Sequence, residues 1–475
     1  MDKTHGPARA RRTAAGPGAG RSRTGAPMPQ TGKTRHALTR RGLFRASAAA
    51  GLATAAVGVL AGCKHGADEV SSDPVVVDTK NATYVIDPNT NESNYKSVNL
   101  WWDDPASYDI ALGTVLRPGE GDWLAATSVG TTTSPIVKAA AFSVTAGTLV
   151  DVVTTMVTQG NPNIMIYDVR CSDSAYAWVE MNLLDKSWAL YASAFEGGAL
   201  IGSSSTLWQA DGNWDPPQFV VTGNKVIWQV MPSLSGNKTA ESSVCYVWKL
   251  GGSEATAAVE SPGRFATPPE LSGDVVTLCP RVRADEGVYY GITAYSVRSD
   301  LDEIVDQLVL PQTVKPLRAT RIGEQFVFSI EASYQSGGLL GTMGTYIGTS
   351  EGKFVVLSRE PYCEAAGTDG VYIIKSRTSY FVVDTQNEQY AILSPANRAV
   401  DYGDFPARDG ECSTFVTFAT IKDPDTGYPS GVRVRAYAVS AGTGKEESTS
   451  DSDDQAGGDS GTASDSTAAT GGESA

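Results

Sequence analysis

Histidine is the residue type that this chain most nearly lacks. Its 475 residues include three histidines, His5, His36 and His65, and none follows His65. Catalysis by Ser-His-Asp or Cys-His groups, histidine-ligated zinc and histidine proton shuttles are therefore excluded from the rest of the chain. Chemistry built on carboxylates alone, or on lysine or tyrosine, is not excluded.

Positive charge is scarce beyond the N-terminal region. Eleven of the 38 Lys and Arg residues, but one of the 53 Asp and Glu residues, lie in residues 1–62, which leaves 27 bases against 52 acids in the remainder. A surface this acidic repels phosphate backbones, so we expect no nucleic-acid partner. It also disfavours direct docking on anionic lipid.

The N-terminal region has the pattern of an export address. Arg40 and Arg41 precede an uncharged, Ala- and Gly-rich run over residues 46–62. A helix of these 17 residues reaches about 25 Å, less than the roughly 30 Å of a bilayer's hydrocarbon core. The stretch resembles a twin-arginine (Tat) export signal. It ends in Leu-Ala-Gly-Cys63, which is similar to the lipobox of bacterial lipoproteins.

These two resemblances imply cleavage before Cys63 and acylation of its thiol. Residues 1–62 are then a signal peptide and residues 63–74 a tether. The protein is exported by the Tat route and lipid-anchored to the outer face of the cytoplasmic membrane, with two or three acyl chains where one would anchor only weakly. The alternative is an Ala-rich N-terminus that carries these residues by chance. Translation starts at Met1 or Met28.

The remaining cysteines show no metal-site or redox spacing. Five are left once Cys63 is lipidated, an odd number, and no CxxC pair occurs among them. We therefore predict no metal and no cofactor, and most of these cysteines as buried thiols in strands. A disulfide between Cys363 and Cys412 is the alternative for one pair. Residues 423–427 resemble part of a calcium loop but lack the terminal Glu of an EF-hand, which favours a hairpin turn.

Residues 441–475 are rich in Ser, Thr, Gly, Ala and Asp and contain no aromatic residue. They carry eight acids and one base. Such a segment buries too little apolar area to offset its ordering entropy, so it is predicted to be disordered. It serves as a spacer, or it is a tail without a role.

A turn with Gly or Asp, followed by an apolar and β-rich run, recurs along the chain at nearly constant spacing. The turns begin near residues 121, 172, 223, 273, 323, 370 and 410. Four strands are predicted within one period, over residues 218–221, 226–230, 244–248 and 256–259. Sustained helical periodicity is absent.

Four-stranded units repeating at this period are typical of a β-propeller. The turn pattern resembles that of TolB-like and WD-repeat-like propellers, which implies an all-β fold of about seven four-stranded blades over residues 75–440. The last period lacks a fourth strand, and residues 84–86 or 98–101 are expected to supply it, because ring closure removes exposed sheet edges. The alternative architecture is two β-sandwich domains.

Two clusters place tryptophan beside carboxylate in predicted loops. Tryptophan faces stack on sugar rings, and neighbouring carboxylates bond the sugar hydroxyls. Tryptophan also packs between blades, which is the favoured interpretation for Trp123, Trp178, Trp228 and Trp248 in strands. The candidate binding residues are Trp101, Trp102 and Asp103 in the first cluster, and Trp208, Trp214 and Asp215 in the second.

No catalytic motif is found, so a binding or scaffold role is favoured over catalysis. The partners expected are the membrane, through the lipid anchor, and an unidentified protein or glycan. One alternative is a carbohydrate-active enzyme that uses carboxylates at the central channel. Another is an assembly factor for a cell-envelope complex. Convergence of two or three Asp or Glu side chains at the channel mouth would favour the enzyme.

Overall fold

The computed structural model describes residues 73–75, 82–87, 90–129, 134–312, 314–330, 344–358, 364–368, 370–395 and 404–442. All of them belong to one compact unit, Ala55–Ala475. The predicted signal peptide, Cys63 and almost all of the predicted C-terminal tail lie outside the described residues. No helix long and apolar enough to cross a membrane occurs in the described part of the chain.

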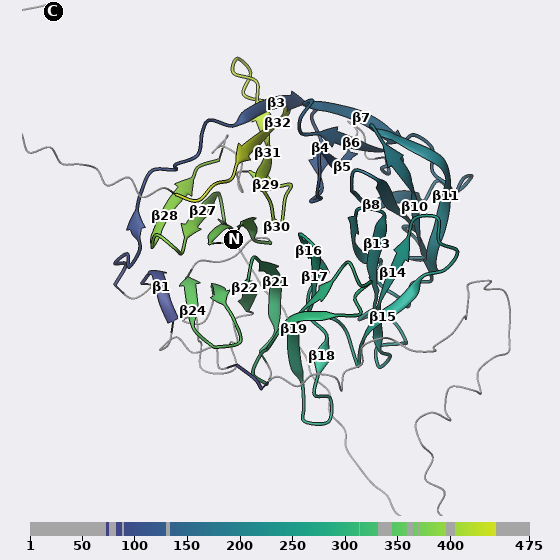
Figure 1. Cartoon of the computed structure of the whole chain (residues 1–475). Helices are drawn as coiled ribbons and strands as arrows, with labels where there is room; N and C mark the ends of the chain where they lie inside the picture. The colour runs from purple at the N-terminus through teal and green to yellow at the C-terminus, as the bar shows by residue number, and fades with distance from the viewer. Residues whose placement is uncertain are drawn as a thin grey trace, which may run out of the picture. The chain divides into compact units, whose positions relative to one another are not determined.

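The described chain is all-β, and its strands form seven sheets that follow one another around a ring (Figure 1). This arrangement is a β-propeller and not a pair of β-sandwich domains. Six of the sheets are blades whose strands follow one another in the sequence. Within each of these blades, the strand order runs from the innermost strand to the outermost strand.

The first three blades are four-stranded antiparallel sheets. Blade 1 contains β4 (Thr114–Leu116), β5 (Trp123–Ser128), β6 (Ala139–Ser143) and β7 (Thr148–Val153). Blade 2 contains β8 (Ile164–Cys171), β9 (Ala175–Asn182), β10 (Trp188–Glu196) and β11 (Ala199–Ala210). Blade 3 contains β12 (Gln218–Thr222), β13 (Lys225–Val230), β14 (Ser243–Lys249) and β15 (Thr256–Ser261).

The next three blades carry additional strands. Blade 4 contains β16 (Glu270–Ser272), β17 (Val275–Leu278), β19 (Tyr289–Ser296) and β20 (Ile304–Val309), with β18 (Arg281–Val282) paired to β19. Blade 5 contains β21 (Pro316–Ile322), β22 (Gln325–Ile330), β23 (Thr345–Gly348) and β24 (Phe354–Leu357). Blade 6 contains β25 (Ala366–Thr368), β26 (Val371–Ser376), β27 (Ser379–Asp384) and β28 (Gln389–Leu393).

The seventh sheet is composite. It joins β29 (Phe405–Pro406), β31 (Thr414–Lys422) and β32 (Pro429–Ala438) from the C-terminal end to β3 (Ala106–Ile110) from the N-terminal end. The prediction of about seven four-stranded blades is therefore corrected to six blades made of consecutive strands. The seventh period forms a sheet shared by both ends of the chain, because its fourth strand comes from the N-terminal segment. Closure by an N-terminal strand is as predicted, but neither predicted segment supplies that strand.

The first of those segments has a different role. Residues 84–86 belong to β1 (Ala82–Ile86), which pairs in parallel with β24 on the outside of blade 5, and residues 98–101 form no strand. β2 (Lys96–Ser97) pairs with β28 in the same way. Together with a bridge from Pro74 to Val309 in β20, these strands cover the outer edges of three consecutive blades, 4 to 6. Covering an edge prevents it from pairing with another chain.

The apolar core lies between neighbouring blades. All eight residues of β9 are buried, because each face of a blade packs on the next blade. Trp178, Trp228 and Trp248 are buried in these layers, as predicted for strand tryptophans. Trp123 is partly buried and meets Phe195 edge to face, with ring centroids 5.6 Å apart.

The connections between strands divide between two faces of the ring, because successive antiparallel strands reverse direction. One face carries the connections from each innermost strand to the second strand and from the third to the fourth. We call it the turn face, since it holds the repeated Gly and Asp turns. The opposite face carries the connections from the second to the third strand and from blade to blade, and we call it the loop face.

Candidate functional site

The central channel of the propeller is crossed by a segment of the composite sheet. This channel plug, residues 407–413, connects β29 to β31 and contains β30 (Gly410–Glu411), which Figure 1 shows inside the ring. β30 pairs in parallel with β25 of blade 6. The Glu411 backbone N–H also donates to Ser272 Oγ of blade 4, at 2.9 Å. The plug therefore ties opposite parts of the ring together.

Gly410 is required at the centre of the plug. Its φ is +60°, and a Cβ there would lie 2.1 Å from the carbonyl oxygen of Leu271. Only glycine combines this left-handed backbone with so close an approach. Asp409 and Gly410, which the sequence pattern identifies as one of the repeated turns, thus lie in the segment that crosses the channel.

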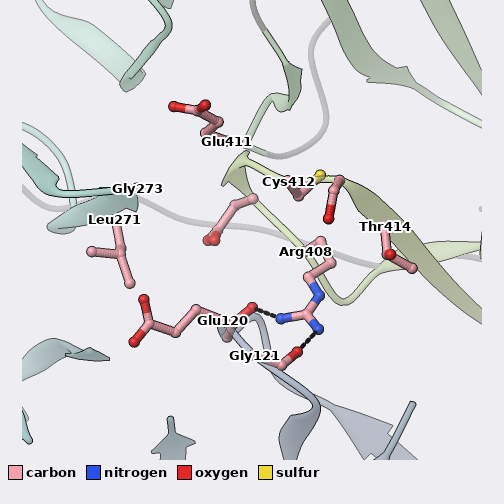
Figure 2. A pocket seen from close by; sticks show the side chains of 11 residues that line it. Glu120, Gly121, Leu271, Gly273, Arg408, Glu411, Cys412 and Thr414 are labelled. Carbon is pink, nitrogen blue, oxygen red and sulfur yellow. Dashed lines mark hydrogen bonds between the residues drawn. The ribbon is translucent and has the colours of Figure 1, made fainter. Parts of the chain in front are cut away.

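Arg408 joins the plug to blade 1. Its guanidinium donates to the backbone carbonyls of Gly119 and Gly121, as Figure 2 shows. The side chain is 6% exposed, and burial lowers the pKa of the guanidinium. Its charge is thus directed at the carbonyls of a blade 1 turn.

The turns of blades 1 to 3 are bound to one another on the turn face. The Glu120 carboxylate accepts hydrogen bonds from the Gly223 backbone N–H at 2.6 Å and from the Thr222 hydroxyl at 3.0 Å. Ser172 donates to the carbonyl of the same Gly223, at 2.5 Å. Burial is the main cause that raises the pKa of Glu120. The repeated turns of these three blades are therefore joined to one another on this side of the channel.

Charged side chains meet inside the channel. Glu270, the first residue of β16, is 3% exposed and forms a side-chain hydrogen bond with Asp409 of the plug. A hydrogen bond between two carboxyl groups needs a proton on one of them. Burial, followed by the charge of Glu364, raises the pKa of Asp409 to about 6 and that of Glu270 well above its usual range. The pair therefore holds a proton at a higher pH than separate carboxyls would.

Arginines balance the other channel acids. Arg318 Nε lies 2.8 Å from Glu364 Oε1. Arg170 Nη1 and Arg117 Nε lie 2.6 and 3.2 Å from the same oxygen of Asp168. The interior is thus a network of paired charges, and not an open acidic pore.

A pocket of about 310 Å³ lies beside the plug. Its lining includes the carboxylates of Glu120, Asp409 and Glu411 and the hydroxyls of Ser413 and Thr414. Figure 2 shows Leu271 and Arg408 on opposite sides of the pocket, with Glu120 and Glu411 at its two ends. Arg408, Glu120 and Asp409 already form hydrogen bonds within the protein. Exposed Glu411 therefore contributes a negatively charged acceptor to the lining, and the Ser413 and Thr414 hydroxyls contribute groups that can accept or donate.

The first predicted tryptophan cluster lies where the two ends of the propeller meet. The indole N–H groups of Trp101 and Trp102 both donate to the carbonyl of Ser440, at 2.8 and 3.1 Å. Trp102 is 8% exposed and packs on Tyr437. Asp103 is exposed beside them. In this structure the two indoles fasten the C-terminal strand to the N-terminal segment.

The second cluster lies between blades 2 and 3. Trp208 packs on Tyr246 with ring centroids 4.6 Å apart. Lys238 Nζ lies 5.0 Å from the Trp214 ring centroid, and Asp215 forms a 2.7 Å ion pair with Arg264. The two clusters contact different blades, and neither lines the pocket.

Sequence reasoning missed the residues of the channel. Asp409 belongs to one of the repeated turns, and Glu120 directly precedes another, so the turn pattern could have singled them out. Nothing in the sequence around Glu270 distinguishes it from other strand residues.

The other sequence predictions can be placed as well. The predicted hairpin turn is confirmed, since Asp423 Oδ1 accepts from the backbone N–H groups of Asp425 and Thr426. Cys363 lies outside the described residues. Among the described residues, no group of three or more His, Cys, Asp or Glu side chains is arranged to hold a metal ion.

No family model and no curated protein matches this chain. Solved structures resemble this chain at low identity and with TM-scores below 0.5. A prolyl endopeptidase structure is 10% identical over 68% of this chain and 45% of its own, with a TM-score of 0.40. The acylaminoacyl peptidase of Pyrococcus horikoshii is 12% identical over 68% and 52%, with a TM-score of 0.41.

A third solved structure is a propeller on its own. The β-propeller domain of the trilobed protease from Pyrococcus furiosus is 11% identical over 67% of this chain and 90% of that domain, with a TM-score of 0.39. This chain spans about half the length of the two larger peptidases. Likeness at this level carries no conclusion about either the fold or the activity of this chain.

Proposed function

We propose that this chain is an exported, lipid-anchored protein whose propeller is a binding module, with its ligand held in the pocket beside the channel plug. The observation that carries the proposal is the pocket itself, about 310 Å³ and built from the plug and the turns of blades 1 and 4. Small-molecule sites are concave and contain a few convergent polar groups. Exposed Glu411 stands at its mouth.

The lining indicates the chemistry of the ligand. The Glu411 carboxylate accepts hydrogen bonds, and the Ser413 and Thr414 hydroxyls accept or donate them, so a ligand rich in hydrogen-bond donors suits the site. A sugar with several free hydroxyl groups fits this requirement. The glycan expected from the sequence is kept in this proposal, but its site is the channel pocket and not the two tryptophan clusters.

A glycan array tests this function with the full chain carrying Cys63→Ser, which keeps the protein in solution. We expect binding that Glu411→Gln weakens by about tenfold, because one charged acceptor is lost. The matched control is Glu351→Gln, which removes an exposed carboxylate in the connection between β23 and β24. Binding that is absent, or equal in the two variants, would contradict the proposal.

The carbohydrate-active enzyme is the second candidate, because channel carboxylates do converge. Glu270 and Asp409 are hydrogen-bonded, and the nearby charge of Glu364 raises the pKa of both. Glycosidases, however, need their two carboxyls about 5 to 9.5 Å apart, with the sugar between them. A directly hydrogen-bonded pair leaves no room for that sugar, so binding without hydrolysis is the function we favour. Release of reducing ends by the wild-type chain, lost in Asp409→Asn, would reverse this choice.

The lipid anchor is a separate part of the proposal. Mass spectrometry of the exported protein should find an N-terminal peptide that begins at Cys63 and carries acyl chains. Cys63→Ser should move the protein from the membrane fraction to the soluble fraction. An exported protein without acyl chains would remove the anchor and leave the binding module standing.

A further inference from the structure

The exposed large apolar side chains in the strand connections of the described chain lie on one face of the ring. Nine large hydrophobic residues in the strand connections are exposed, and all nine lie on the loop face. Leu184, Leu234 and Tyr428 are 75%, 77% and 75% exposed. Among the described connections of the turn face, no large hydrophobic residue is exposed. Exposed apolar side chains that lie on the same face of a protein can act together at an interaction site.

Acidic charge is concentrated on the other face, the turn face. The described connections of the turn face contain 13 acids and 4 bases, including the plug. Those of the loop face contain 10 acids and 7 bases, or 8 bases when Arg281 of β18 is included. The acidity that disfavours docking on anionic lipid is therefore mainly a property of the turn face.

The N-terminal segment reaches the ring at the loop face. The Val75 backbone N–H donates to the carbonyl of Val309, the last residue of β20, at 2.8 Å. Asp73 pairs with Arg283, which lies in a loop-face connection of blade 4, at 3.2 Å. Cys63 is ten residues before Asp73, and ten residues span at most about 35 Å. An acyl chain on Cys63 thus holds this face within a short distance of the membrane.

We infer that the loop face rests on the lipid surface to which Cys63 is attached, with its exposed leucines and Tyr428 in the interfacial layer, and that the turn face with its pocket points away. This inference rests on the proposed lipid anchor. Apolar side chains insert favourably into the headgroup boundary, and the acidic turn face is repelled from anionic lipid. The orientation leaves the pocket open to ligands from outside the cell.

Lysine acetylation followed by mass spectrometry tests the orientation. The acylated chain is compared in vesicles of phosphatidylcholine, in vesicles of equal parts phosphatidylcholine and phosphatidylglycerol, and as the soluble Cys63→Ser chain. Lys138 and Lys186 lie exposed on the loop face, and Lys353 lies exposed on the turn face. We expect Lys138 and Lys186 to react several-fold more slowly on both kinds of vesicle and Lys353 to react at an unchanged rate. Equal changes at all three lysines would overturn the inference.

Two variants show whether the apolar side chains cause the protection. Leu184→Ser combined with Leu234→Ser should restore the acetylation rate at Lys186, because the side chains that hold this face in the lipid are removed. The variant should fold normally, since both leucines are exposed and bury nothing in the fold. Ile201→Ser is the matched control, since Ile201 is 50% exposed on β11, the outer strand of blade 2, and is not part of the loop face. Protection that survives the double variant would overturn the role of the leucines.

Failure of the anchor and failure of the orientation can be told apart. If the exported protein carries no acyl group, the same acetylation experiment is done with a hexahistidine tag replacing the lipid at position 63, on nickel-chelating lipid. Protection of Lys138 and Lys186 on that surface supports the orientation without the natural anchor. Equal reactivity of both faces there overturns it.

Discussion

The carboxyl groups of Glu270 and Asp409 meet inside the channel, one from the innermost strand of blade 4 and the other from the plug, and they are hydrogen-bonded. This bond cannot form between two ionised carboxylates, because a proton has to lie between the two groups. The plug is therefore held in place partly by a protonated acid. This arrangement makes the stability of the ring depend on pH.

The first prediction concerns that pH dependence. Asp409 has a pKa of about 6 in the folded chain, above the value near 4 of an aspartate in an unfolded chain. The folded state therefore binds more protons between these values, and the free energy of unfolding falls as pH rises from about 4 to about 6, by an amount on the order of 1 to 3 kcal/mol. Urea unfolding at a series of pH values measures it. Asp409→Asn should flatten this slope, whereas Glu351→Gln should keep it.

The second prediction concerns the backbone of the plug. Gly410→Ala places a methyl group against the Leu271 carbonyl and should lower the free energy of unfolding by about 3 kcal/mol or more. Gly427→Ala is the control, because Gly427 also has a positive φ, +71°, but nothing lies within 4 Å of its added Cβ. Its loss should be about 1 kcal/mol. Similar losses in the two variants would show that the close approach to Leu271 is unimportant.

The third prediction concerns Arg408. Arg408→Met keeps most of the side-chain volume and removes both hydrogen bonds to the blade 1 turn, which should lower the free energy of unfolding by about 2 to 4 kcal/mol. Arg298→Met is the control, since Arg298 is 80% exposed in its ion pair with Asp274. Exposed ion pairs contribute about 0 to 1 kcal/mol. Thermal unfolding of the two variants measures the difference.

The fourth prediction concerns the N-terminal strand on blade 5. Val85 in β1 is fully buried, although it is supplied from outside the blade. Val85→Ala should lower the free energy of unfolding by about 1 to 3 kcal/mol, because it leaves a cavity between β1 and the blades it covers. Val157→Ala, at a position 45% exposed on the loop face, should change stability little. A neutral Val85→Ala would mean that β1 adds nothing to the stability of the ring.

The sequence by itself determined the blades. Gly223 and Gly273 adopt positive φ in the repeated turns, with φ of 49° and 56°. Such turns can be recognised from the sequence, because few residues other than glycine tolerate this backbone conformation. Strands of β-branched and aromatic residues between the turns then pair with their nearest neighbours, which makes a blade a local structure.

Only the tertiary structure decided how the ring closes and what fills its channel. β3 pairs with β32, which lies more than 300 residues later in the chain. The residues of β3 are exposed or partly exposed, and their pattern resembles that of any other edge strand. Glu270 and Asp409 meet only because the plug crosses the ring. Such contacts depend on where the ends of the blades lie in space, and local turn chemistry and strand pattern contain no information about that position.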